Sequence, residues 1–154
     1  MLSRLPLVLA CLLTAAPAWA AAPETAARGS VSAEIAPATT SIYVGSVTLS
    51  VDTLVRHAGV YVSNYTARVF PFFFCNESGQ LRMDVTDAEL RRLASGMPVD
   101  FTGYAVRGDG LTRPVQGHAV PRGPADGQVK VRVVVSRNLT LIFNTTYHLT
   151  GRLD

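Results

Sequence analysis

The stretch VKVRVVVSRNLTLIFNTTYHL, residues 129–149, alternates apolar and polar side chains over two segments that a short polar break separates. Alternation with a period of two is typical of a β-strand that has one buried face and one solvated face. The break falls at Arg137-Asn138, and asparagine tolerates the positive φ that tight turns require. We therefore predict an antiparallel hairpin with strands at 129–137 and 139–149.

The same alternation recurs through most of the chain after residue 41, and predicted turns such as Asn76-Glu77-Ser78-Gly79 and Gly108-Asp109-Gly110 punctuate it. Seven strands are predicted, at 47–52, 60–70, 80–85, 99–107, 111–121, 129–137 and 139–149. We expect the segment Pro71–Cys75 to extend the second of them, with aromatic residues on both faces. Strands of this length joined by short turns predict an all-β, mainly antiparallel fold, either a β-sandwich or a small β-barrel.

One short α-helix is expected between the third and fourth predicted strands. Thr86 and Glu89 have the spacing of a capping box, and Gly96 followed by Pro98 indicates the end of the helix. A predicted apolar stripe follows the i, i+3, i+4, i+7 rule and comprises Leu90, Leu93, Ala94 and Met97. Such an amphipathic helix is suited to cover an open edge or end of the sheet.

The N-terminus has the three parts of a secretory signal peptide. Arg4 is followed by an apolar run from Leu5 to Ala16 and then by Ala18-Trp19-Ala20, with small residues where a signal peptidase needs them. The run is too short to cross a bilayer, which takes roughly 20 residues. We predict cleavage after Ala20, no transmembrane segment in the mature chain, and a bacterial protein located in the periplasm or outside the cell. Lipoprotein processing at Cys11 is the less favoured alternative.

The mature chain divides into two predicted parts. Residues 21–40 are rich in Ala, Pro, Ser and Thr and contain few large apolar residues, so we expect a flexible leader. Residues 41–151 are long enough for one hydrophobic core and are expected to form a single β-domain.

Cys75 is the lone cysteine of the predicted mature chain, so an internal disulfide is excluded. It follows three consecutive phenylalanines. We expect a buried, unreactive thiol at this position, because free cysteine behaves as a small hydrophobic residue.

The three histidines, His57, His118 and His148, are the candidate metal ligands of this chain. They lie in separate segments without a close partner at ligand spacing, and readable zinc sites usually contain such a pair. A three-histidine site assembled from three strands stays open as a hypothesis, but polar surface positions are the favoured interpretation.

Other signs of catalysis or nucleic-acid binding are missing from the sequence. It contains no nucleophile elbow and no phosphate-binding glycine loop, so no catalytic residue and no cofactor are predicted. The formal net charge of the whole chain is +3, with arginines scattered singly rather than gathered in a stripe. We therefore lean towards a non-catalytic protein that does not bind nucleic acid.

The sequence leaves three functional hypotheses. The favoured one is an exported β-domain that binds an unidentified protein, polymer or small ligand of the bacterial envelope or extracellular space, or has a structural role there. The alternative is a small-ligand carrier in which Phe70–Phe74, Tyr65 and Tyr104 line a barrel cavity. An enzyme or metal protein that uses the three histidines is the least favoured hypothesis.

Overall fold

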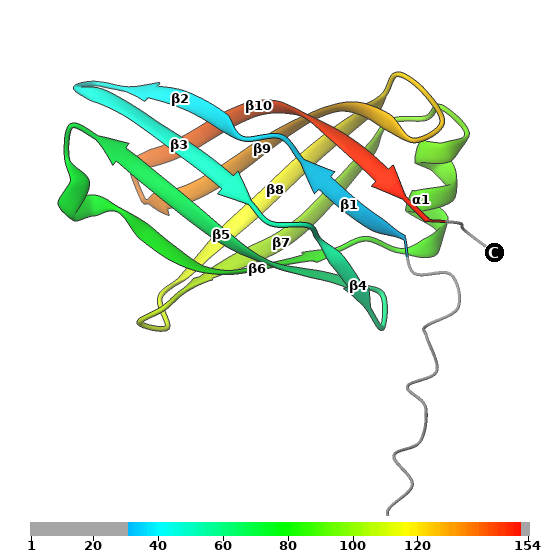
Figure 1. Ribbon diagram of the computed structural model, residues 1–154, viewed down its shortest axis with the longest axis horizontal. Helices are drawn as coiled ribbons and strands as arrows, with labels where there is room; N and C mark the ends of the chain where they lie inside the picture. Colours follow the sequence, from blue (N-terminus) through cyan, green and yellow to red (C-terminus); the bar gives the residue numbers. More distant parts are fainter. Residues whose placement is uncertain (1–30, 152–154) are drawn as a thin grey trace, which may run out of the picture.

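Residues 31–151 are described by a computed structural model, and most of them belong to a single antiparallel sheet of ten strands (Figure 1). The strands are β1 (Ser32–Ile35), β2 (Ala38–Ile42), β3 (Gly45–Val51), β4 (Val55–His57), β5 (Val60–Phe70), β6 (Glu77–Asp84), β7 (Val99–Arg107), β8 (Thr112–Pro121), β9 (Asp126–Ser136) and β10 (Leu139–Thr150). The prediction of an all-β antiparallel fold is confirmed.

The sheet follows the order β1-β10-β9-β8-β7-β6-β5-β3-β2, with β4 paired to β5 beyond the end of β3. Most neighbours are therefore consecutive hairpins, as the alternating segments predicted. In the hairpin of β9 and β10, Val131 lies opposite Phe143, and both side chains are buried. Lys130 and Asn144 are exposed on the other face.

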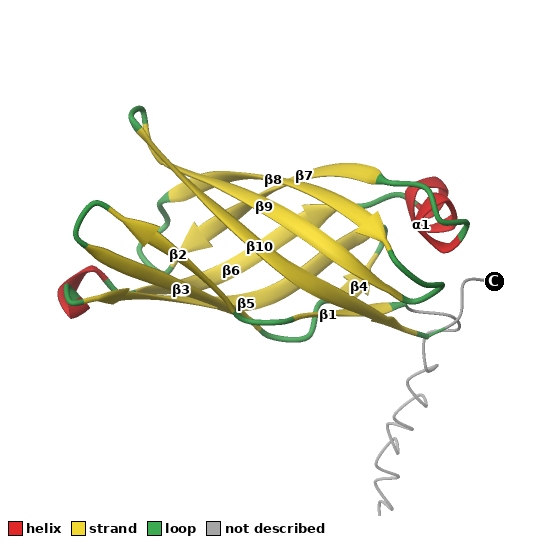
Figure 2. Ribbon diagram, turned by 90° about the horizontal axis from the view of Figure 1, so that it is seen from above, coloured by secondary structure: helices red, strands yellow, loops and turns green. Residues whose placement is uncertain are grey.

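The sheet curls into a half-barrel because its N-terminal segment contacts both edges (Figure 2). β1 pairs with β10, whereas β2, which follows directly, pairs with β3. An isolated bridge joins Ala33 of β1 to Leu54, between β3 and β4. In this bridge the Ala33 N–H donates to the Leu54 carbonyl at 3.0 Å, and the Leu54 N–H donates back at 2.8 Å. Of the two predicted architectures, a β-sandwich and a small β-barrel, the structure is nearer to the barrel, because its single sheet is a curled half-barrel.

The half-barrel has two different ends. At one end, here called the helix end, lie the helix α1 (Asp87–Ala94), the β4–β5 turn and the β8–β9 loop. At the other, here called the open end, lie the β2–β3, β5–β6, β7–β8 and β9–β10 connections (left in Figure 1). The β5–β6 connection contains η1, a 3₁₀ turn at Phe73–Cys75.

The helix end is closed by α1. Thr86 caps the helix, and the reciprocal bonds of the predicted capping box are both present. Leu90 and Leu93 are buried against the sheet, with 1% and 6% of their surface exposed. Arg56 of β4 anchors the first turn of the helix, since it pairs with Asp87 and donates to a backbone carbonyl nearby.

Two expectations about this helix need correction. It lies between β6 and β7 rather than between a third and a fourth strand, because the chain forms ten strands and not about seven. Ala94 and Met97 are exposed rather than part of the buried stripe. The helix ends at Ala94, so Met97 no longer follows the helical period, and Gly96 turns the chain away with a φ of 85°.

The missed strands are short or rich in small polar residues. β1 and β2 lie within residues 21–40 and just beyond, so the expectation of a flexible leader is wrong for residues 32–40. Backbone pairing with β10 and β3 satisfies their polar groups, and Ile35 and Ile42 pack against the core. Residues 1–20, including the predicted cleavage site after Ala20, lie outside the described residues.

The segment between β5 and β6 also differs from the prediction. Pro71–Cys75 does not continue the strand, because the chain turns through η1. Of the predicted turn at Asn76–Gly79, residues 77–79 are instead the start of β6. Gly79 is required there by close packing, since a Cβ at this position would lie 2.0 Å from the Val106 carbonyl oxygen of β7.

Candidate functional site

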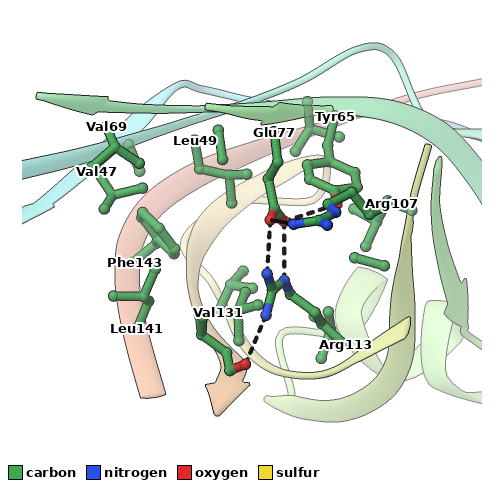
Figure 3. A pocket seen from close by; sticks show the side chains of 18 of the residues that line it. Val47, Leu49, Tyr65, Val69, Glu77, Arg107, Arg113, Val131, Leu141 and Phe143 are labelled. Carbon is green, nitrogen blue, oxygen red and sulfur yellow. Dashed lines mark hydrogen bonds and ion pairs between the residues drawn. The ribbon is translucent and has the colours of Figure 1, made fainter. Parts of the chain in front are cut away.

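A cavity of about 480 Å³ occupies the half of the half-barrel towards the open end. Its wall is mainly aliphatic, and Figure 3 shows representative side chains pointing into it from β3, β5, β9 and β10. They include Val47, Leu49, Val69, Val131, Leu141 and Phe143. A volume of this size falls in the range of roughly 300–1,000 Å³ that is typical of small-molecule sites.

The cavity exists because inward-facing side chains change size along the strands. On β5, Tyr61 faces the helix end, whereas Ala67 and Val69 face the open end. On β7, Phe101 packs near the helix and Ala105 lines the cavity. On these two strands the larger inward-facing residues lie towards α1, and the smaller ones leave space in the half towards the open end.

One polar cluster crosses this apolar interior. Glu77 of β6 receives two hydrogen bonds from Arg113 of β8, from Nε at 3.1 Å and from Nη2 at 2.8 Å (Figure 3). Arg113 Nη1 also donates to the Val135 carbonyl at 2.7 Å. The side chains of Glu77 and Arg113 are only 14% and 11% exposed. This bidentate geometry is the strong form of an arginine–carboxylate pair.

Two further residues complete the cluster. The Tyr65 hydroxyl donates to Glu77 Oε1 at 3.0 Å, and Arg107 Nη1 lies 3.8 Å from Oε2. Burial and the negative charge of Glu77 raise the pKa of Tyr65 to about 12, so the phenol keeps its proton at neutral pH. The cluster thus sets two guanidinium groups against one carboxylate beside an apolar cavity, and it offers hydrogen-bonding groups to a polar atom of a ligand.

The predicted aromatic lining is only partly present. Tyr65, Phe72 and Phe74 line the cavity, the last two at its mouth. Phe70 and Phe73 are 61% and 65% exposed and do not line it. Tyr104 is likewise outside the lining and 40% exposed. The wall is consequently aliphatic rather than aromatic.

Sequence reasoning missed the polar cluster. Glu77 lies in a segment that we predicted to be a turn. The sequence therefore did not indicate whether its side chain faces the interior or the solvent. Arg113, however, shares the inward face of its strand with Val115, Gly117 and Ala119. An arginine in phase with buried residues is the signal that could have identified a buried ion pair.

The three histidines do not come together. They lie on β4, β8 and β10 with their side chains exposed. His118 pairs with Asp100 of β7, with Nδ1 2.6 Å from Oδ1. Within residues 31–151 no group of three His, Cys, Asp or Glu side chains is arranged to hold a metal ion.

Cys75 is exposed, which corrects the expectation of a buried thiol. The expectation assumed that residues 71–75 continue a strand, whereas the turn at Pro71 and η1 carries Cys75 to the mouth of the cavity.

Comparisons with protein-family models, with curated proteins and with solved structures found no match to this chain. Among residues 31–151, none of the helices has the length and apolar character of a membrane span. Any functional conclusion therefore depends on the geometry of the half-barrel.

Proposed function

We propose that this protein is an exported, non-catalytic β-domain that binds a small, mainly apolar molecule inside its half-barrel. The observation that carries the proposal is the cavity of about 480 Å³ with its aliphatic wall. Apolar surface left unfilled in an interior loses both packing and burial energy, and a ligand of matching shape restores them.

The ligand most compatible with this wall has an apolar body and one polar group. Aliphatic side chains do not fix the orientation of a bound ligand. Glu77, Arg113 and Arg107 lie on one side of the cavity and provide hydrogen-bonding groups that can fix it. Few polar groups in an otherwise apolar pocket are the usual arrangement in ligand sites. This arrangement favours a carrier over the broader alternative of a structural module or a domain that binds a protein or a polymer.

Export is part of the proposal. It is supported by the apolar run 5–16 and by the small residues before the predicted cleavage site after Ala20. A carrier of apolar molecules fits an aqueous compartment such as the periplasm, in which these molecules are poorly soluble.

The test uses the uncharged apolar fluorophore N-phenyl-1-naphthylamine as the probe. We expect saturable binding with one site per chain. Ala67→Phe places a ring in the cavity and is expected to weaken binding by roughly tenfold or more, because it removes space that a ligand needs. Thr66→Phe is the matched control, since residue 66 is the exposed neighbour on the same strand.

Thr66→Phe should bind the probe as the wild type does. Absence of saturable binding to the wild type, or equal affinity in the Ala67→Phe protein, would contradict the proposal. Urea unfolding of both variants shows whether each remains folded.

A further inference from the structure

Exposed apolar side chains surround the mouth of the cavity. We call this set the rim, and it comprises Tyr43, Val44, Phe70, Phe73 and Phe74. Tyr43 is fully exposed, and Phe74 is 85% exposed. Soluble proteins rarely expose apolar side chains in such a group unless another molecule covers them.

The rim is contiguous, although its residues come from two connections. β3 pairs with β5 so that Ser46 lies opposite Phe70, which places the β2–β3 turn beside the β5–β6 connection. Both connections lie at the open end in Figures 1 and 2. Packing within the rim does not bury it, since the Phe70 and Phe73 rings meet edge to face at 5.8 Å and both stay exposed.

The charges beside the rim are basic. Arg68 lies two residues before Phe70, and Arg137 lies in the β9–β10 turn. Both are exposed, and within residues 31–151 neither has a carboxylate at ion-pair distance. The acidic side chains of the open end, Glu77 and Asp109, are each paired with an arginine.

Carboxylates are more numerous at the helix end. Those in and around α1 and in the connections of that end are Asp84, Asp87, Glu89, Asp100 and Asp126. The helix end also carries Arg56, Arg91, Arg92 and Arg122, so the two ends differ in the balance of charge. Arginines outnumber carboxylates at the open end, beside the apolar rim, whereas carboxylates outnumber arginines at the helix end.

We propose that the open end docks on the surface of an anionic lipid bilayer, with Tyr43, Phe73 and Phe74 inserted among the headgroups. Aromatic side chains favour that region, and arginines are attracted to anionic lipids. A second copy of this chain could cover the apolar rim but would bring the same exposed arginines to the contact, where like charges repel. Docking would direct the cavity mouth towards the membrane, yet it does not require that the cavity binds a ligand.

The first test is flotation of the exported protein with vesicles of phosphatidylcholine and phosphatidylglycerol. We expect the wild type to float with them, and binding to fall by roughly tenfold or more in Phe73→Ser/Phe74→Ser, since two exposed rings no longer partition into the lipid. Met97→Ser/Val120→Ser is the matched control, because both residues are exposed and lie away from the rim. It should float like the wild type.

The second test addresses charge. Arg68→Gln/Arg137→Gln should weaken binding to these vesicles by roughly twenty-five-fold, from about fivefold for each arginine near an anionic surface. The control Arg91→Gln/Arg92→Gln removes two exposed arginines of α1 and should leave binding unchanged. Vesicles of phosphatidylcholine alone should bind the wild type more weakly.

Three results would overturn docking. They are a wild type that does not float, rim variants that float as well as the wild type, and a wild type that forms a dimer through the rim, measured by light scattering, without binding vesicles. Failure of the ligand proposal is distinguishable, because probe binding is measured without vesicles. A protein that binds the probe but no vesicles contradicts docking alone, and one that floats but binds no probe contradicts the carrier function alone.

Discussion

Glu77 determines the polar character of the cavity, because Arg113, Tyr65 and Arg107 all direct a polar group towards its carboxylate. With the carboxylate removed, the Arg113 guanidinium would remain in a largely apolar interior without an opposing charge, whereas the more exposed Arg107 would keep its pair with Asp109. Removing one partner of a buried ion pair leaves the full desolvation cost of the other. The exposed pair of His118 and Asp100 has water to replace a lost partner.

We therefore expect Glu77→Gln to lower the free energy of unfolding by about 3 kcal/mol, measured by urea denaturation. The control Asp100→Asn should cost about 1 kcal/mol or less. Spectroscopic titration provides a second readout. The pKa of Tyr65 should fall from about 12 in Glu77→Gln, because the negative charge is lost while Arg113 and Arg107, which lower this pKa, remain. An unchanged tyrosine titration would show that Glu77 does not act on Tyr65.

At the scale of the elements, the long strands and the helix could be predicted because local signals agree with the fold there. Strand 99–107 and the capping box at Thr86 match the structure. β1, β2 and β4 could not be predicted, since they are only three to five residues long, and β1 in addition pairs with β10 far along the chain. The cavity had no local signal either, because it results from inward positions on many strands.

The contact between β7 and β8 shows how closely the helix end is packed. Gly117 lies opposite Phe101, and a Cβ at residue 117 would be 1.9 Å from Cζ of the Phe101 ring. The glycine therefore provides the space into which the aromatic ring packs. Because the Phe101 ring occupies the space beside Gly117, an added methyl group must displace the ring or the strands.

We expect Gly117→Ala to lower the free energy of unfolding by about 2 kcal/mol through overpacking. Adding Phe101→Leu should recover part of the loss, since the smaller side chain leaves room for the methyl group. Gly108→Ala is the control, because its Cβ would lie 3.8 Å from the nearest neighbour, and it should change stability by about 0.5 kcal/mol at most. If the changes in the free energy of unfolding caused by Gly117→Ala and Phe101→Leu were fully additive, the two residues would not be in energetic contact.

At the scale of the whole molecule, the half-barrel is held in its curled shape where β1 meets Leu54. Within residues 31–151, the backbone hydrogen bonds that join β1 to the chain between β3 and β4 are the two between Ala33 and Leu54. Leu54 is completely buried, so its carbonyl has no water to replace a lost partner. β1 is bonded to β10 through its other edge, and the two edges of β1 can be tested separately.

Ala33→Pro tests this closure, because proline cannot donate to the Leu54 carbonyl. We expect a loss of about 2 kcal/mol in the free energy of unfolding, the cost of one buried acceptor left unsatisfied. Hydrogen exchange at the Leu54 amide should accelerate, whereas exchange in the hairpin of β9 and β10 should change only as much as global stability does. Ala33→Ser retains the N–H and should leave the Leu54 amide protected. Unchanged exchange at Leu54 in the proline variant would mean that other contacts keep the half-barrel curled.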